Sequence, residues 1–192
     1  MPAELQRIYL GYISPSASAG DVRTIMEYDS GALDGIALWK GTQLSPNVFK
    51  DVKLYVAPNG QVGDCVPNIL SLPIISTRFK KLLYPLVTGD VQFFEAPLYD
   101  QETRKPESGY WVMNILARSD CIDFQRSEYS YFPESDIICS FEKYCMDSKR
   151  LPSAAIFRDE NTASEFFVSE AVMRIARHAT ITGITFEEIE VS

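Results

Sequence analysis

Short runs of strand-forming residues, separated by turn-forming segments, dominate the first part of the chain. Residues Arg7 to Ile13 are rich in β-branched and aromatic side chains, and the stretch 14–20 that follows has the composition of a loop. Asp51 to Val56 alternates polar and apolar positions, which is typical of a half-buried strand. The pattern predicts a β-rich N-terminal part over residues 1–70, packed on the same core as the rest. Trp39 is predicted to be a core residue.

Two capped helices are predicted in the remainder of the chain. Ser76 is a good N-cap because its hydroxyl can accept a hydrogen bond from an unpaired amide of the first helical turn, and an apolar stripe follows it. Pro85 predicts that this helix ends near Tyr84. Ser169 begins a second short helix, which carries the apolar residues Val172, Met173, Ile175 and Ala176.

Apolar segments between and after these helices predict strands. Tyr110 to Leu116 is apolar except for Asn114, as expected of a central strand that is covered on both faces. Cys139 is predicted to be a core residue of another strand. The fold class is predicted to be α+β, with a mixed, mostly antiparallel sheet and two or three short helices. The further predicted strands are Val91–Glu95, Ile137–Tyr144, Ala154–Phe157 and Ile184–Val191.

Similar residues recur 93 positions apart in the region 71–192. Ile75-Ser76 matches Val168-Ser169, and Phe93 matches Phe186, so each copy is a capped helix that leads into a strand. Either a helix-strand unit has been duplicated, or the likeness is the shared pattern of any such unit. We expect residues 1–70 and 71–192 to form one globular domain.

The net charge of the chain disfavours some classes of binding partner. The chain carries a formal net charge of −8, which opposes binding to nucleic acid and to an anionic membrane surface. The N-terminus shows no secretory signal, and no apolar run approaches the ~18 residues of a membrane span. A cytoplasmic location is therefore predicted, with reduced thiols at Cys65, Cys121, Cys139 and Cys145.

Signatures of catalysis are missing from the sequence. His178, at the end of the second helix, is interpreted as a surface residue, because no sequence signature supplies a nucleophile or an orienting partner. The irregular cysteine spacing disfavours a zinc site, and no glycine-rich phosphate loop is present. No catalytic residue, no metal site and no cofactor is therefore predicted. A pair of carboxylates for acid/base chemistry remains an alternative.

Acidic and aromatic residues are concentrated between Ser119 and Glu142, a stretch that contains six acidic residues and one basic residue, Arg126. A second acidic stretch, from Asp159 to Glu165, is predicted to be a loop. Acids beside aromatic side chains suit the recognition of a basic protein surface, although a solvated acidic face is the simpler alternative. The predicted partner-binding residues are Glu128, Tyr131, Phe132, Glu134, Asp136, Asp159 and Glu160.

Three pieces of the second half resemble a bacterial family of immunity proteins found beside polymorphic toxins. They begin at Leu72-Pro73-Ile74-Ile75-Ser76, at Gly109-Tyr110-Trp111-Val112-Met113 and at Ala155-Ile156-Phe157-Arg158. The resemblance covers roughly residues 70–190, with little to match before residue 70. It implies a non-enzymatic cytoplasmic antidote that binds and neutralises a cognate toxin protein. The acidic stretches described above favour a basic toxin. An enzyme with an unrecognised carboxylate site and a protein-binding module unrelated to toxins are the alternatives.

Overall fold

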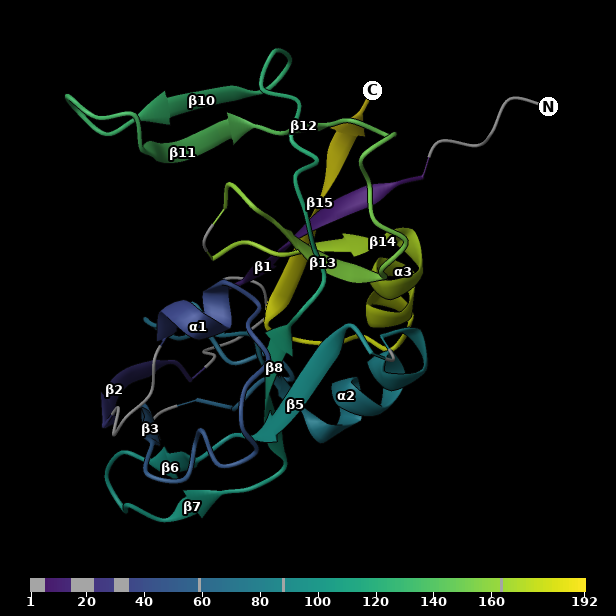
Figure 1. The fold of residues 1–192 in the computed structure, drawn as a ribbon. Coiled ribbons are helices and arrows are strands. Elements are labelled where there is room, and N and C mark those ends of the chain that lie inside the picture. Colours follow the sequence, from purple (N-terminus) through teal and green to yellow (C-terminus); the bar gives the residue numbers. More distant parts are fainter. Residues whose placement is uncertain (1–5, 15–22, 30–34, 59, 88, 163) are drawn as a thin grey trace.

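The computed structural model describes residues 6–14, 23–29, 35–58, 60–87, 89–162 and 164–192. Within these ranges three short α-helices and one 3-10 helix accompany fifteen mostly short strands (Figure 1). The strands form mixed sheets in which antiparallel pairs predominate, which confirms the predicted fold class in outline. None of the helices in these ranges is long and apolar enough to cross a bilayer.

A six-stranded sheet organises the upper part of the molecule in Figure 1, and its central strand comes from the N-terminal part. β1 pairs antiparallel with both β14 and β15, so that Leu10 lies opposite Phe167 on one side and Glu187 on the other. Its apolar side chains Ile8 and Leu10 are buried. The sheet order is β12 (Cys145–Met146), β15 (Ile184–Val191), β1 (Ile8–Ile13), β14 (Phe167–Ser169), β13 (Ile156–Asp159) and β9 (Arg118–Ser119).

A three-stranded sheet has the predicted central strand in its middle. This strand, β8, pairs antiparallel with β4 on one side and with β5 on the other. The amide of its buried Asn114 donates to the Thr42 carbonyl (2.8 Å) and to the Gln92 side chain (2.9 Å), which ties an N-terminal loop to the sheet. The strand bounds are Ile74–Ser76 for β4, Tyr110–Ile115 for β8 and Val91–Glu95 for β5.

The two predicted helices begin at the predicted residues. Helix α2 (Thr77–Leu83) starts after Ser76, whose Oγ accepts from the Phe79 amide at 3.1 Å, and ends where Pro85 introduces the 3-10 helix η2 (Tyr84–Leu86). Helix α3 (Glu170–His178) starts after Ser169, but that hydroxyl makes no capping hydrogen bond. Instead Glu170 places a negative charge in the first turn, where the helix dipole favours it.

The two units that resemble each other in sequence also share one arrangement. In each, a strand, a helix and a second strand follow one another, and a strand from elsewhere lies between the two: β8 between β4 and β5, β1 between β14 and β15. Both helices bury their apolar faces in the same core cluster, which includes Phe79, Leu83, Val172 and Met173. The arrangement does not test how the likeness arose, so a duplication stays a prediction.

A four-stranded sheet with a second core cluster forms the lower part of the molecule (Figure 1). The short helix α1 (Gly35–Trp39) lies beside it. Trp39 is only half-buried and donates from Nε1 to the Leu70 carbonyl at 3.3 Å, so it lies at the rim of the core rather than inside it. The sheet order is β2 (Ile25–Asp29), β3 (Lys53–Val56), β6 (Leu98–Asp100) and β7 (Pro106–Glu107).

Asp64 holds the two resembling units together. Its carboxylate accepts hydrogen bonds from Ser76 Oγ (2.7 Å), Arg78 Nη2 (2.7 Å) and the Thr182 amide (3.2 Å). Burial alone would raise the pKa of Asp64, but the hydrogen bonds from these three residues outweigh it, so the pKa is lowered. The charged carboxylate therefore contributes to the stability of the native fold.

We expect Asp64→Asn to lower the free energy of unfolding by about 2–3 kcal/mol at pH 7, because its donors lose a charged acceptor. Since the folded pKa lies below the unfolded value of about 3.9, this contribution is present above that value and is lost as pH falls through the folded pKa. Urea unfolding at pH 7 and pH 3 measures it, with the exposed Asp51→Asn as control. A wild-type-to-variant difference that is equal at both pH values would contradict the interpretation.

Candidate partner-binding surface

A β-hairpin projects from the upper part of the molecule (Figure 1). It consists of β10 (Glu128–Tyr131) and β11 (Ile138–Lys143), which pair only with each other among the described strands. The turn is closed by a hydrogen bond from the Phe132 amide to the Ile137 carbonyl (2.9 Å), and Glu134 adopts a left-handed conformation with φ 58°. Because an isolated two-stranded hairpin is marginally stable at best, its base needs support from the body of the protein.

Charged groups provide part of that support. One carboxylate oxygen of Glu190, on β15, accepts from Arg126 at 2.9 Å, and the other accepts from Lys143 at 2.8 Å. Arg126 lies in the turn before β10 and Lys143 is the last residue of β11, so one acid holds both ends of the hairpin base. The hydrogen bond from Lys143 lowers the pKa of Glu190, which keeps this clamp charged at neutral pH.

A chain of contacting aromatic rings provides further support for the hairpin base. Tyr131 contacts Tyr129 (ring centroids 5.5 Å apart), Tyr129 contacts Phe141 (5.6 Å), Phe141 stacks on Tyr144 (4.5 Å) and Tyr144 meets Phe167 (5.4 Å). Phe167 is fully buried in the core beneath the six-stranded sheet. Aromatic pairs in these geometries add about 0.5–1.5 kcal/mol each beyond their buried area. The hairpin is therefore held in one orientation relative to the body.

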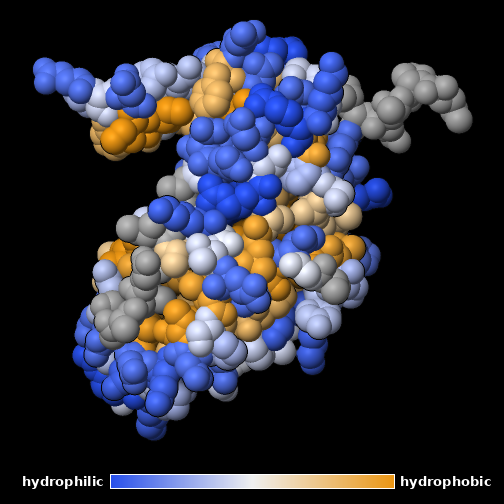
Figure 2. Space-filling view, viewed as in Figure 1, coloured by the Kyte–Doolittle hydropathy of each residue, from blue (hydrophilic) through white to orange (hydrophobic). Residues whose placement is uncertain are grey.

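The end of the hairpin exposes large apolar side chains. Tyr131, Phe132 and Ile137, which we call the tip cluster, are between 50% and 68% exposed. Glu134 and Asp136 lie beside them in the turn and are exposed as well. Figure 2 shows hydrophobic residues along the side of the hairpin that faces the body, above an open recess in the molecular surface. A grouped apolar surface on a well-anchored projection is typical of a site for protein contact.

Six of the seven predicted partner-binding residues lie exposed on this side of the molecule. Five of them are on the hairpin: Glu128, Tyr131, Phe132, Glu134 and Asp136. The sixth, Glu160, is in the loop between β13 and β14, which lies below the hairpin in Figure 1. Acidic and aromatic groups predicted from two separate stretches are thus brought to one side of the fold.

The prediction for Asp159 is wrong. This residue is the last of β13 rather than part of a loop, and it is fully buried. Its Oδ2 accepts from the amides of Cys121 (2.8 Å) and Ile122 (3.1 Å), and its Oδ1 accepts from the Asn161 amide (2.8 Å). The carboxylate organises neighbouring backbone and is not available to a partner.

The prediction of a core position for Cys139 is also wrong, and Ile137 is absent from the predicted partner-binding residues. Cys139 is exposed on β11, because this strand has no core beneath its outer part. Ile137, the most exposed member of the tip cluster, was assigned only to a strand. A turn-forming segment, Pro133-Glu134-Ser135-Asp136, between two strand-forming runs was the signal for a hairpin tip at this place.

Other parts of the described surface are weaker candidates for a functional site. An open groove of about 510 Å³ between β1, α3 and β15 contains Glu170 and Glu188, but Arg7, Arg174 and Arg177 line it with them. His178 is exposed at the end of α3. Burial and the neighbouring Asp159 raise the pKa of the Cys121 thiol, which disfavours a nucleophilic thiolate. Among the described residues, no three metal-binding side chains lie close enough to hold an ion.

The structure thus defines a strand-rich α+β protein with a surface suited to contact with another protein. The model of the Immunity protein family (Imm11) matches residues 28–191, and the chain belongs to this family. The resemblance inferred from sequence is confirmed, but the matched region starts at residue 28 rather than near residue 70. A comparison with curated proteins gave no match. Family membership implies that a toxin is the partner of this chain.

Proposed function

We propose that this chain is a cytoplasmic immunity protein that binds a cognate toxin and neutralises it by covering its active site or substrate groove. Family membership supports the antidote role. The observation that supports this mode of action best is the tip cluster, which is exposed on a hairpin that is clamped to the body by Glu190 and by the aromatic chain. Binding, rather than catalysis, is the proposed activity.

The hairpin combines the two properties that a protein contact needs. Tyr131, Phe132 and Ile137 would supply apolar area at the centre of the interface, where a few large side chains carry most of the binding energy. Glu134 and Asp136 would surround that centre with negative charge, which attracts a basic surface and accelerates encounter. Because the hairpin is already fixed in position, little conformational entropy is lost when it binds.

Reversing the charge of the turn tests this proposal. We expect Glu134→Lys combined with Asp136→Lys to slow association with the toxin encoded immediately upstream by about tenfold or more at low salt. Glu95→Lys combined with Glu102→Lys, two exposed acids far from the hairpin, makes the same change in net charge and should alter the rate by less than about twofold. Stopped-flow association kinetics measure both. Equal rates for the two double variants would contradict the proposed contact.

A further inference from the structure

A second group of large apolar side chains is exposed on β2 and on the loop that follows β3. Met26, Tyr28 and Ile69, which we call the β2 patch, are between 41% and 61% exposed. The Ile69 amide donates to the carbonyl of Ile25 at 3.3 Å, which places Ile69 next to Met26. β2 is also an edge strand of its sheet and carries an irregularity in its pairing with β3 at this point. The patch is thus an exposed apolar surface where the edge strand β2 bridges to the segment around Asn68.

A series of hydrogen bonds connects the β2 patch to the hairpin side of the molecule. Trp39, at the end of α1, donates to the carbonyl of Leu70, the residue after Ile69. Arg118 donates to the Trp39 carbonyl at 3.2 Å and to the Glu160 carbonyl at 3.3 Å. Glu160 belongs to the loop below the hairpin. These hydrogen bonds link the backbone beside the β2 patch, through the end of α1, to the loop below the hairpin.

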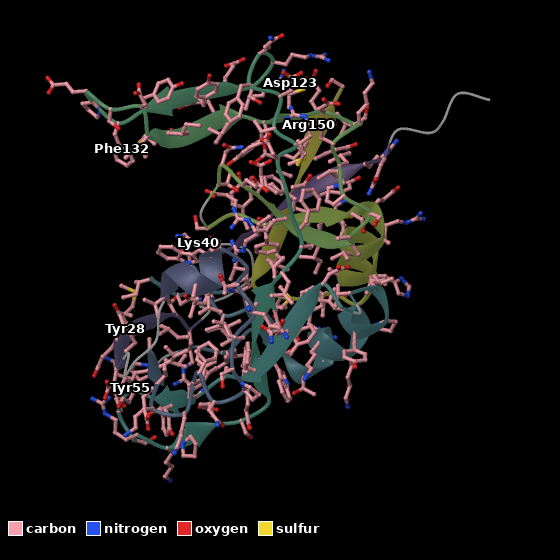
Figure 3. All side chains as sticks on the ribbon, in the orientation of Figure 1. Tyr28, Lys40, Tyr55, Asp123, Phe132 and Arg150 are labelled. Atoms are coloured by element: carbon pink, nitrogen blue, oxygen red, sulfur yellow. The ribbon has the colours of Figure 1, made fainter. Side chains whose placement is uncertain are left out.

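Figure 3 shows this alignment directly. Phe132 at the hairpin, Lys40 at the end of α1 and Tyr28 on β2 lie one below another along the same side of the molecule. The other large exposed apolar residues of the described chain, Tyr12 and Tyr84, do not belong to either group. Figure 3 thus places one member of the tip cluster and one member of the β2 patch on the same side of this view.

The size of a stable interface indicates that both parts are needed. Such interfaces bury about 800 Å² on each partner. A fully buried aromatic side chain accounts for about 150–250 Å², so three half-exposed side chains at the tip supply less than half of that area. A toxin that contacted the tip cluster alone would be held by a small interface. A partner that also reaches the β2 patch would gain the missing area.

We propose that one toxin domain is bound at two places at once, the tip cluster and the β2 patch, and spans the recess between them. This inference rests on the proposed function and adds a second contact surface to it. The partner would present a basic surface to the acidic hairpin and an apolar surface to the β2 patch. The exposed Lys40 lies between Phe132 and Tyr28 in Figure 3, so an acidic group on the partner would complement it there.

Charged substitutions in the β2 patch test the proposal. We expect Met26→Asp combined with Ile69→Asp to raise the Kd for the upstream-encoded toxin about 100-fold, mainly through faster dissociation, because apolar contacts act after encounter. Tyr84→Asp, at a similarly exposed position away from this side, is the control and should leave the Kd within about twofold. Surface plasmon resonance separates the two rate constants, and thermal melts check that each variant is folded.

The outcomes separate this inference from the proposed function. Loss of binding in both the hairpin and the patch variants supports two contacts. A patch variant that dissociates like the wild type, while the hairpin variant binds poorly, overturns the second contact and leaves the proposed function standing. A wild-type protein that does not bind the toxin overturns both. A patch variant that changes only the self-association of the free protein, seen by analytical ultracentrifugation, assigns the β2 patch to a second copy of this chain and also overturns the inference.

Hydrogen–deuterium exchange on the unmodified complex gives an independent readout. Residues 25–29 and 68–70 should become protected when the toxin binds, together with residues 131–138 of the hairpin. Protection confined to the hairpin would contradict a second contact, whatever the variants show.

Discussion

Replacing Tyr131, Phe132 and Ile137 together with alanine is expected to raise the Kd for the upstream-encoded toxin by about 100-fold or more. A few hot-spot side chains in an interface cost about 2 kcal/mol or more when they are truncated, and a total loss of about 2.8 kcal/mol corresponds to a 100-fold change in Kd. The same side chains are at least half exposed in the free protein, and of the aromatic contacts described above only that between Tyr131 and Tyr129 is lost, so the fold should lose little stability. The variant therefore separates binding from folding.

Isothermal titration calorimetry of the purified toxin domain with this variant measures the change. Tyr84→Ala is the matched control, because Tyr84 is a large exposed aromatic residue at the end of α2, away from the hairpin. Its Kd should stay within about threefold of the wild type. A tip variant that binds as tightly as the control would show that the hairpin does not carry the interface.

Gly183→Ala is expected to have the largest effect on stability, a loss of about 3 kcal/mol or more, which corresponds to a fall in Tm of about 6–12 °C. Gly183 has φ +80°, where a side chain is strained, and a Cβ added there would overlap the carbonyl oxygen of Cys65. To remove this overlap, the two segments joined by the hydrogen bond from the Cys65 amide to the Thr182 carbonyl (2.9 Å) would have to move apart. That separation would also disturb the Asp64 network.

Gly89→Ala isolates the contribution of backbone strain. Gly89 has a similar φ of +89°, but a Cβ there would meet no atom of the described residues within 4 Å. We expect it to cost about 1–2 kcal/mol, the price of the left-handed conformation alone. Calorimetric melts of both variants measure the comparison. Equal losses at the two positions would mean that the close approach of residue 183 to Cys65 is not important for stability.

Local signals in the sequence were sufficient for the helices and the central strand. Ser76 and Pro85 act through their own backbone chemistry, so the first helix begins and ends where they predict. The apolar run from Tyr110 gives a strand between two others for a similar reason, since its side chains need cover on both faces. The loop assigned to Asp159 failed because a buried acid with several amide donors has the same sequence signature as an exposed one.

Long-range pairing could not be read from the pattern. Residues 8–13 look like any strand, yet they lie at the centre of a sheet formed mainly from the second half of the chain. The matched family region starts at residue 28, after this strand. Only the pairing with β14 and β15 shows that the N-terminal strand completes the core of the C-terminal part.

The candidate binding surface was likewise predicted only in part from the sequence. The acidic and aromatic composition of residues 119–142 was visible in the sequence. The projection of the hairpin and the exposure of its tip arise because β10 and β11 pair with each other and with no other described strand, which the composition does not predict. The β2 patch gave no signal at all, because Met26 and Ile69 are far apart in the chain and come together only through the contact of residue 69 with Ile25.

Co-expression with the product of the adjacent upstream gene tests the proposed function most directly. Growth of cells that express the toxin should be restored by this chain, and the two proteins should co-purify as a stable one-to-one complex. The variant with alanine at Tyr131, Phe132 and Ile137 should fail in both assays although it is folded. An upstream gene product that is harmless and does not bind this chain would contradict neutralisation by direct binding. Restored growth without any complex would contradict it as well.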